Sequence, residues 1–82
     1  MGTTRKQIEE WFDRGVEQGA THMIVACDTF DWEDYPVYVK KGENAHDRAR
    51  NLGEMQKVME CYRLDPAQKQ AQLNAFRVFN YD

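Results

Sequence analysis

The sequence predicts a small α+β domain, in which a mostly antiparallel β-sheet has helices packed on one face. Three observations lead to this fold class. Apolar residues near the N-terminus recur at helical spacing, two segments rich in β-branched and aromatic residues follow, and a proline-headed helix start lies near the C-terminus. Because 82 residues suffice for one domain only, residues 1–82 are expected to form a single unit. The expected order is α-β-β-α-(β)-α-β.

The first expected element is an amphipathic helix over residues 4–18. Thr4 followed by Gln7 matches a capping box, and Gly19 stands where a left-handed C-cap is expected. The apolar stripe has the i, i+3, i+4, i+8 spacing of one buried helix face: Ile8, Trp11, Phe12 and Val16.

A hairpin of two strands is expected next. Residues 22–30 begin with a nearly continuous apolar run, which is typical of a central strand or one covered on both faces. Residues 35–40 are rich in aromatic and β-branched side chains, and Pro36 indicates an edge strand or a strand beginning. The short acidic connection between them favours antiparallel pairing.

A second helix and a third strand are expected after the hairpin. Asn44 is a suitable N-cap for a helix that runs to about Leu52, with Gly53 closing it. Residues 56–64 fit both a helical stripe and a strand. We favour the strand, since Gly53 would cost a continuous helix about 1 kcal/mol relative to alanine.

The C-terminal part predicts one more helix and a closing strand. Asp65 as N-cap and Pro66 at the first helical position mark a helix start. This helix is expected to end near residue 74, and the aromatic segment 76–81 is expected to be the last strand of the sheet.

Charge and composition restrict the class of partner. The net charge is −3, with a balance of −5 over residues 1–39 and +2 over residues 40–82, which argues against general nucleic-acid binding. The longest apolar run, residues 23–27, is too short for a membrane span, so a cytoplasmic protein is expected. Because so small a domain has a thin core, a homo-oligomer is an expected option.

Several common chemistries find no residues here. The chain has no serine, no glycine-rich phosphate loop and no zinc-ligand spacing, so no metal and no cofactor are expected. Cys27 or Cys61 could pair with His22 or His46, but both thiols lie in apolar segments, where they are usually inert. A non-enzymatic role is expected.

The acidic-aromatic segment, residues 28–35, is the densest candidate surface, with four carboxylates among three aromatic rings. It could be a solvated hairpin turn, a recognition surface, or, less in keeping with its spacing, a calcium or magnesium site. Its candidate ligand-binding residues are Asp28, Phe30, Asp31, Trp32, Asp34 and Tyr35.

The basic segment, residues 40–50, is the second candidate surface. It combines cationic side chains with a predicted helix N-terminus, which attracts anions through its free amides. The alternative is an ordinary solvated basic helix. Its candidate ligand-binding residues are Lys40, Lys41, His46, Arg48 and Arg50.

One block resembles a known group of sequences. Residues 19–39 are similar to a group of small bacterial and phage proteins, which share the core Cys-Asp-Thr-Phe-Asp-x-Glu-Asp-Tyr-Pro-Val-Tyr-Val, present here as residues 27–39. The resemblance covers about a quarter of the chain and carries over no activity or site residue. Its association with phages implies a role as an antagonist of host defence.

Two functional hypotheses follow. The first is a binding protein that captures a small anionic, nucleotide-like ligand, with aromatic rings stacking on the base and cationic side chains neutralising phosphate. The alternative is a protein-binding inhibitor or adaptor, in which Phe30, Trp32 and Tyr35 are anchors and the carboxylates address a basic surface of a host protein.

Overall fold

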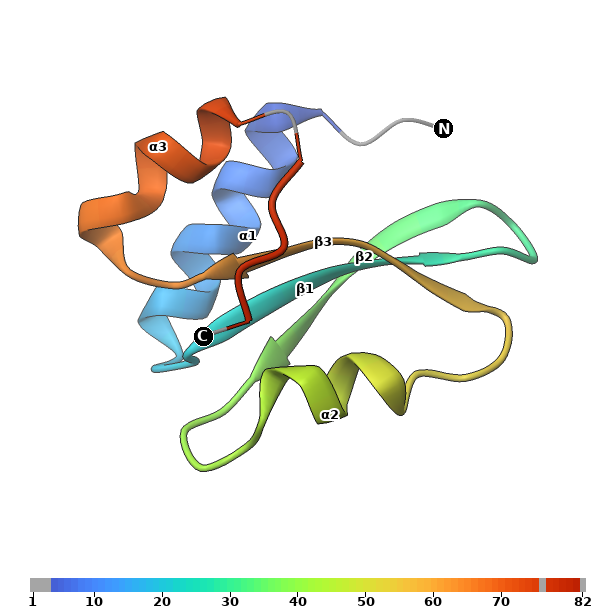
Figure 1. The fold of residues 1–82 in the computed structure, drawn as a ribbon. Helices are drawn as coiled ribbons and strands as arrows, with labels where there is room; N and C mark the ends of the chain where they lie inside the picture. Colours follow the sequence, from blue (N-terminus) through green and yellow to red (C-terminus); the bar gives the residue numbers. More distant parts are fainter. Residues whose placement is uncertain (1–3, 76, 82) are drawn as a thin grey trace.

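The computed structural model describes residues 4–75 and 77–81. The elements along the chain are α1 (Arg5–Glu17), β1 (His22–Asp28), β2 (Glu33–Val39), α2 (Ala45–Arg50), β3 (Gln56–Arg63), the 3₁₀ turn η1 (Pro66–Gln68) and α3 (Lys69–Asn74). The three strands form one antiparallel sheet in the order β2-β1-β3 (Figure 1). The α+β class and the element order are confirmed, and the ambiguous segment 56–64 is a strand.

Helix α1 begins and packs as its sequence predicts. The side chain of Thr4 accepts a hydrogen bond from the backbone of Gln7, whose side chain accepts one from the backbone of Thr4. Gly15 allows the close approach of the helix, because a Cβ there would lie only 2.6 Å from Leu64 Cδ1 and 2.8 Å from Tyr38 Cε1. Gly19 follows the helix with φ +75°, as expected for a left-handed cap.

The helices cover both faces of the sheet, which differs from the expectation of one covered face. Helices α1 and α3 lie on one side and α2 on the other (Figure 1). The core below α1 and α3 consists of Ile8, Phe12, Ala20, Met23, Val25, Tyr62, Leu64, Leu73 and Val78. The core below α2 consists of Ile24, Val39, Ala45 and Cys61, with partly buried neighbours.

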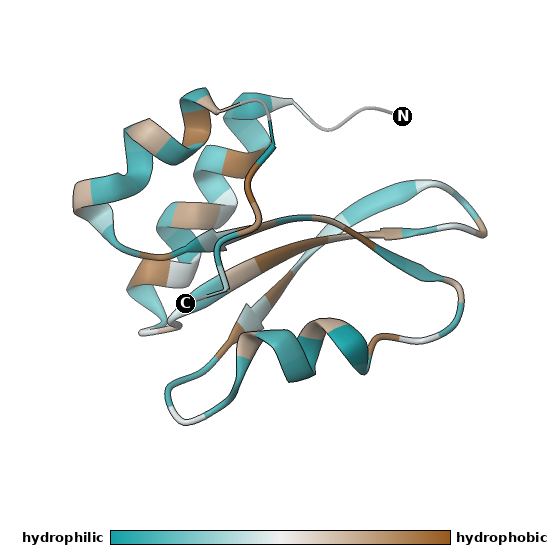
Figure 2. Cartoon of the chain, viewed as in Figure 1, coloured by the Kyte–Doolittle hydropathy of each residue, from teal (hydrophilic) through white to brown (hydrophobic). Residues whose placement is uncertain are grey.

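The physical reason for this correction lies in β1. Successive strand residues point to opposite faces, and both sets are apolar: Met23 and Val25 belong to the α1 core, while Ile24 belongs to the α2 core. A central strand that is apolar on both sides needs cover on both sides. Figure 2 shows that β1 is largely hydrophobic, whereas α2 is mostly hydrophilic. Helix α2 turns its buried residue, Ala45, inward.

The predicted closing strand is reduced to a single parallel bridge between Phe79 and Cys61. The backbone of Cys61 donates to Val78 O (2.7 Å) and accepts from Asn80 N (2.9 Å). The amide of Val78 is taken by the carboxylate of Glu60 (3.2 Å), so a side chain replaces a ladder bond at this point. Phe76, which the prediction included, lies outside the described residues.

Strand β2 is an edge strand, as Pro36 predicted. The amide of Leu64 donates to the carbonyl of Thr21, the residue just before β1, so this carbonyl points to β3. Because backbone groups alternate in direction along a strand, the odd-numbered residues of β1 also direct theirs to β3. Val25, the pairing partner of Pro36, is one of them. Pro36 therefore faces away from β1, where the sheet needs no N–H donor.

In the part of the chain that the structure describes, no helix combines the length and the apolar character that a bilayer span requires.

Candidate functional site

The turn between β1 and β2 displays two large aromatic rings. The exposed fraction is 80% for Phe30 and 61% for Trp32. The third predicted ring, Tyr35, is half-buried, and its hydroxyl is hydrogen-bonded to the side chain of Gln56 on β3. Two of the three predicted anchors are thus available to a partner, whereas Tyr35 helps to hold the sheet.

Two of the predicted carboxylates shape the turn. Asp28 Oδ1 accepts from the amide of Phe30 (2.9 Å), and Asp31 Oδ1 accepts from the amide of Glu33 (3.1 Å). The amide of Trp32 donates to Asp28 O (2.6 Å). Such side-chain bonds to nearby amides are typical of Asp in turns, and here they fix the backbone that carries the rings.

Trp32 has a backbone conformation that suits glycine better. Its φ is +60°, and it is the only non-glycine residue with positive φ in the described part of the chain. For an L-residue this left-handed conformation costs roughly 1–2 kcal/mol. A bulky ring that is both exposed and held in an unfavourable conformation contributes little to the fold, which favours a role in recognition.

Met55 joins this end of the molecule, although sequence reasoning did not select it. Both the amide and the hydroxyl of Thr29 donate to Met55 O, at 2.7 and 2.8 Å, which holds the segment before β3 beside the turn. The Met55 side chain is 49% exposed. We call Phe30, Trp32 and Met55 the tip patch. No local signal connects Met55 to the turn, because only the pairing of β3 with β1 brings them together.

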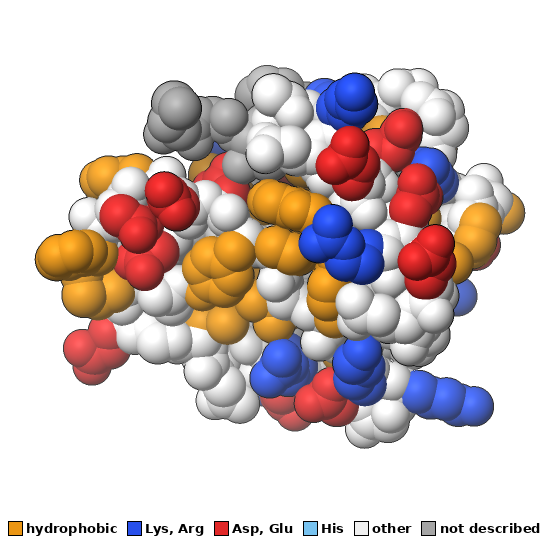
Figure 3. Space-filling model, turned by 180° about the vertical axis from the view of Figure 1, so that it is seen from behind, with side chains coloured by type: hydrophobic (Ala, Val, Ile, Leu, Met, Phe, Trp, Pro, Cys, Tyr) orange, Lys and Arg blue, Asp and Glu red, His pale blue; other side chains and the backbone are white. Residues whose placement is uncertain are grey.

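Figure 3 shows the hairpin end from behind, on the left, with hydrophobic side chains beside a group of acidic ones. The residues at this end that carry exposed or half-buried carboxylates are Asp28, Asp31, Glu33, Asp34 and Glu54. Residues 28–35 contain no cationic side chain, and the exposed Lys57, which pairs with Cys27 on β1, is the one cation that the register places near this end among the described residues. The tip patch is therefore apolar with an acidic border.

The basic segment lies elsewhere. Val39 pairs with His22 at one end of the hairpin and Glu33 with Asp28 at the other, so Lys40 and Lys41 follow the end of β2 that is remote from the turn. At about 3.3 Å per residue, the seven residues of β2 separate the two ends by about 20 Å. Within one chain, the turn and these two lysines are not brought together.

Four of the five predicted residues of the basic segment have partners within the fold. Arg48 pairs with Glu43 (3.9 Å), and Arg50 pairs with Asp47 one helical turn earlier. His46 stacks on the ring of Tyr81, with centroids 4.3 Å apart and planes 21° from parallel. The ζ-amine of Lys40 donates to the side chain of Gln18 (3.0 Å). These contacts agree with the alternative of an ordinary solvated basic helix.

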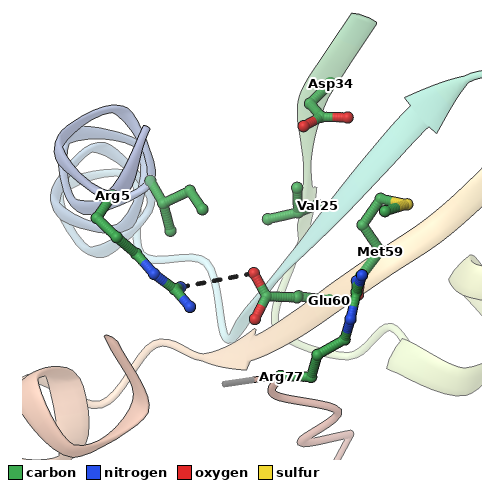
Figure 4. A pocket seen from close by; sticks show the side chains of 7 residues that line it. Arg5, Val25, Asp34, Met59, Glu60 and Arg77 are labelled. Atoms are coloured by element: carbon green, nitrogen blue, oxygen red, sulfur yellow. Dashed lines mark hydrogen bonds and ion pairs between the residues drawn. The ribbon is translucent and has the colours of Figure 1, made fainter. Parts of the chain in front are cut away.

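A second candidate site is a hollow on the α1 face, around a buried carboxylate. Glu60 is only 7% exposed. Its Oε1 accepts from the hydroxyl of Tyr62 (2.9 Å), its Oε2 accepts from the amide of Val78 (3.2 Å), and Arg5 lies 3.7 Å from Oε1 (Figure 4). Burial, reinforced by the hydrogen bond to Glu60, raises the pKa of Tyr62 to about 12. Sequence reasoning missed this site, because one glutamate in an apolar strand gives no signal of its depth.

The two thiols have no features of a reactive site. Both are buried and free. Burial raises the pKa of Cys61 to about 12. The pKa of Cys27 is also raised, mainly by burial and to a smaller extent by the neighbouring Asp34. A thiol becomes nucleophilic as its thiolate, so neither is activated near neutral pH. Among residues 4–75 and 77–81, no three His, Cys, Asp or Glu side chains are grouped as metal ligands.

No family model, no curated protein and no solved structure matches this chain. Function is therefore inferred from the geometry of the site alone.

Proposed function

We propose that the chain is a protein-binding module that docks through the tip patch. The observation that carries this proposal is the exposure of Phe30 and Trp32 on a turn whose backbone is fixed by Asp28 and Asp31. Aromatic side chains dominate the energetics of protein interfaces, and a rigid presentation lowers the entropy lost on binding.

The acidic border indicates the chemistry of the partner. An apolar cleft with cationic side chains around its edge would take the rings of Phe30 and Trp32 and face the surrounding carboxylates. Because these carboxylates are at the rim, they are expected to accelerate association more than they strengthen the complex, and added salt is expected to weaken binding.

Capture of a nucleotide-like anion stays a prediction with less support. It requires the rings and the cationic side chains to reach one small ligand. In a single chain Lys40 and Lys41 lie about 20 Å from the turn, at the other end of β2. The carboxylates at the turn would also repel phosphate.

Site-specific photo-crosslinking tests the proposal. The amino acid p-benzoylphenylalanine is introduced at position 30 in one protein and at position 41, at the remote end of β2, in the matched control. Each protein is irradiated in the same cell lysate. Crosslinking to one defined protein is expected from position 30 and not from position 41.

A second variant separates recognition from folding. Trp32→Gly removes the ring and leaves a residue that accepts φ +60° without strain, so the melting temperature is expected to be unchanged or higher. The same change in the position-30 protein should remove the crosslinked product. Equal crosslinking from both positions, or a product unaffected by Trp32→Gly, would contradict docking through the tip patch.

A further inference from the structure

Strand β2 leaves one edge of the sheet open. It is the last strand in the order, and among the described elements only β1 packs extensively against it. The amide of Thr21 donates to Val39 O (2.7 Å), so the odd-numbered residues of β2 bond towards β1. Pro36 and Tyr38 therefore direct their backbone groups outward. Such an edge is a template for pairing with a further strand.

The two ends of this edge carry opposite charges. Glu33 begins β2, and Lys41 follows two residues after its last residue, Val39. Both side chains are exposed, and neither takes part in an ion pair found among the described residues. A strand that is acidic at its start and basic just after its end is complementary to a second copy of itself that runs in the opposite direction.

Pro36 restricts the register of such a pair. If it lay opposite itself, both central hydrogen bonds would be lost, because proline has no N–H. With Val37 on the two-fold axis, Pro36 lies opposite Tyr38, and each pair keeps one bond, from the amide of Tyr38 to the carbonyl of Pro36. This register also brings Glu33 of each copy beside Lys41 of the other. Hydrogen bonding and charge thus favour the same alignment.

The next register along the strand is less favourable. With Tyr38 on the axis, Pro36 would lie opposite Lys40, whose amide already donates to Glu43 Oε1 (2.8 Å). Glu33 would then approach Glu43, a group of the same charge. The end of the open edge is therefore set by the bond between Lys40 and Glu43.

We propose that two copies of this chain associate through β2, in antiparallel orientation and with Val37 on the two-fold axis. The three strands of each copy then form one continuous sheet, and the same surface of both copies makes the contact. An edge contact of this kind buries less than the roughly 1,200 Å² of a standard interface, so the dimer is weak and depends on concentration. Residues 29–32 precede the paired segment, so the tip patch stays exposed, and the second copy adds its Lys41 to the acidic border.

Exchange of charges tests the proposed register. Sedimentation equilibrium of the purified protein at concentrations up to about 1 mM is expected to show a monomer–dimer equilibrium that added salt weakens. Glu33→Lys alone and Lys41→Glu alone each create two like-charge contacts and should weaken the dimer about tenfold. An equimolar mixture of the two variants has opposite charges at both ends and should restore the dimer. Glu9→Lys, the same change on α1, is the control and should have no effect.

Disulfide trapping locates the axis. In the proposed register Val37→Cys places two thiols directly opposite each other, with Cα atoms about 4.5 Å apart, a distance that a disulfide can bridge. In a glutathione redox buffer this variant is expected to form a covalent dimer. Met55→Cys is the control, because the two turns lie at opposite ends of the dimer, and it should stay monomeric under reducing gel conditions and in the same buffer. The native Cys27 and Cys61 are buried.

Three results would overturn the proposal: a monomer over the whole concentration range, a mixture of charge variants no stronger than each alone, or equal trapping through Met55→Cys and Val37→Cys. Trp32→Gly lies outside the paired segment and should leave the dimer unchanged. Crosslinking from position 30 is carried out in dilute lysate, where a weak dimer dissociates. Failure of this pairing and failure of docking through the tip patch are therefore distinguishable.

Discussion

The two faces of the sheet are covered in different ways. The α1 face has a continuous core that includes the ring of Phe12, which packs edge-on against Tyr62 with centroids 6.5 Å apart. The α2 face is covered by a helix of six residues, and its fully buried side chains are smaller: Ile24, Val39, Ala45 and Cys61. The α1 face also holds a buried carboxylate, Glu60, where the α2 face is apolar. Because the α1 face buries more and larger apolar side chains, we expect it to contribute most of the stability.

The largest expected effect tests that conclusion directly. Phe12→Ala removes a fully buried ring and should lower the free energy of unfolding by about 3–5 kcal/mol. Leu52→Ala, which truncates a half-buried side chain of the α2 core, should cost about 1 kcal/mol. Both are measured by urea denaturation with tryptophan fluorescence.

A domain of this size has only about 5–15 kcal/mol of stability, so Phe12→Ala can fail to fold. Phe12→Leu keeps most of the apolar volume and should cost less than about 1.5 kcal/mol. If Leu52→Ala proves as costly as Phe12→Ala, the two faces contribute equally and the comparison is wrong.

A smaller effect is expected at the polar feature of the α1 face. Glu60→Gln leaves one oxygen to accept from the hydroxyl of Tyr62 or the amide of Val78, and its amide group then faces the other donor. The loss should be about 1–3 kcal/mol. Hydrogen exchange should also show faster exchange of the Val78 amide. Glu54→Gln, at an exposed site beside the turn, is the control, and an equal effect of both changes would show that burial of Glu60 is unimportant.

The smallest expected effect compares neighbours in β3 that belong to opposite faces. The pKa of Cys61, in the α2 core, is raised from 9.0 to about 12, and that of Tyr62, in the α1 core, from 10.0 to about 12. Each group therefore keeps its proton in the folded protein at a pH where the unfolded chain has released it. The stability is fully present below pH 9 and falls as the pH rises towards 12, by at most about 1.4 kcal/mol per pH unit for each group.

Variants separate the two contributions to this pH dependence. Cys61→Ala should flatten the profile of unfolding free energy between pH 9 and 10, where the α2 face responds first. Tyr62→Phe should flatten it above pH 10. A profile that is level from pH 8 to 11 in the unmodified protein would show that neither burial perturbs titration.

Much of the local structure could be predicted from adjacent residues. The capping box of α1, the left-handed Gly19, the Asn44 cap of α2 and the hairpin all follow from short-range chemistry, and each is present. The position of α2 could not be predicted in this way. Its inward residues show which side is apolar, but not which face of the sheet receives it.

The candidate site was predictable to a similar extent. The acidic-aromatic segment was found from composition, because Asp, Thr and aromatic residues between two strands mark a turn. The nucleotide hypothesis assumed that this segment lies close to the basic segment. The register of β1 with β2 instead places Lys40 and Lys41 at the end of the hairpin that is remote from the turn. Met55 and Glu60 escaped notice because their environments are made by residues distant along the chain.

The sequence by itself determined the kind and the order of most elements and the caps of α1 and α2, since capping, periodicity and turn propensity act over a few residues. The tertiary structure decided which side chains are displayed, which are buried, and which charges meet. Those properties depend on contacts such as Thr29 with Met55 and Glu60 with Val78, which span 26 and 18 residues. Short-range pattern carries no information about such contacts, because they form only when the sheet and the two layers that cover it come together.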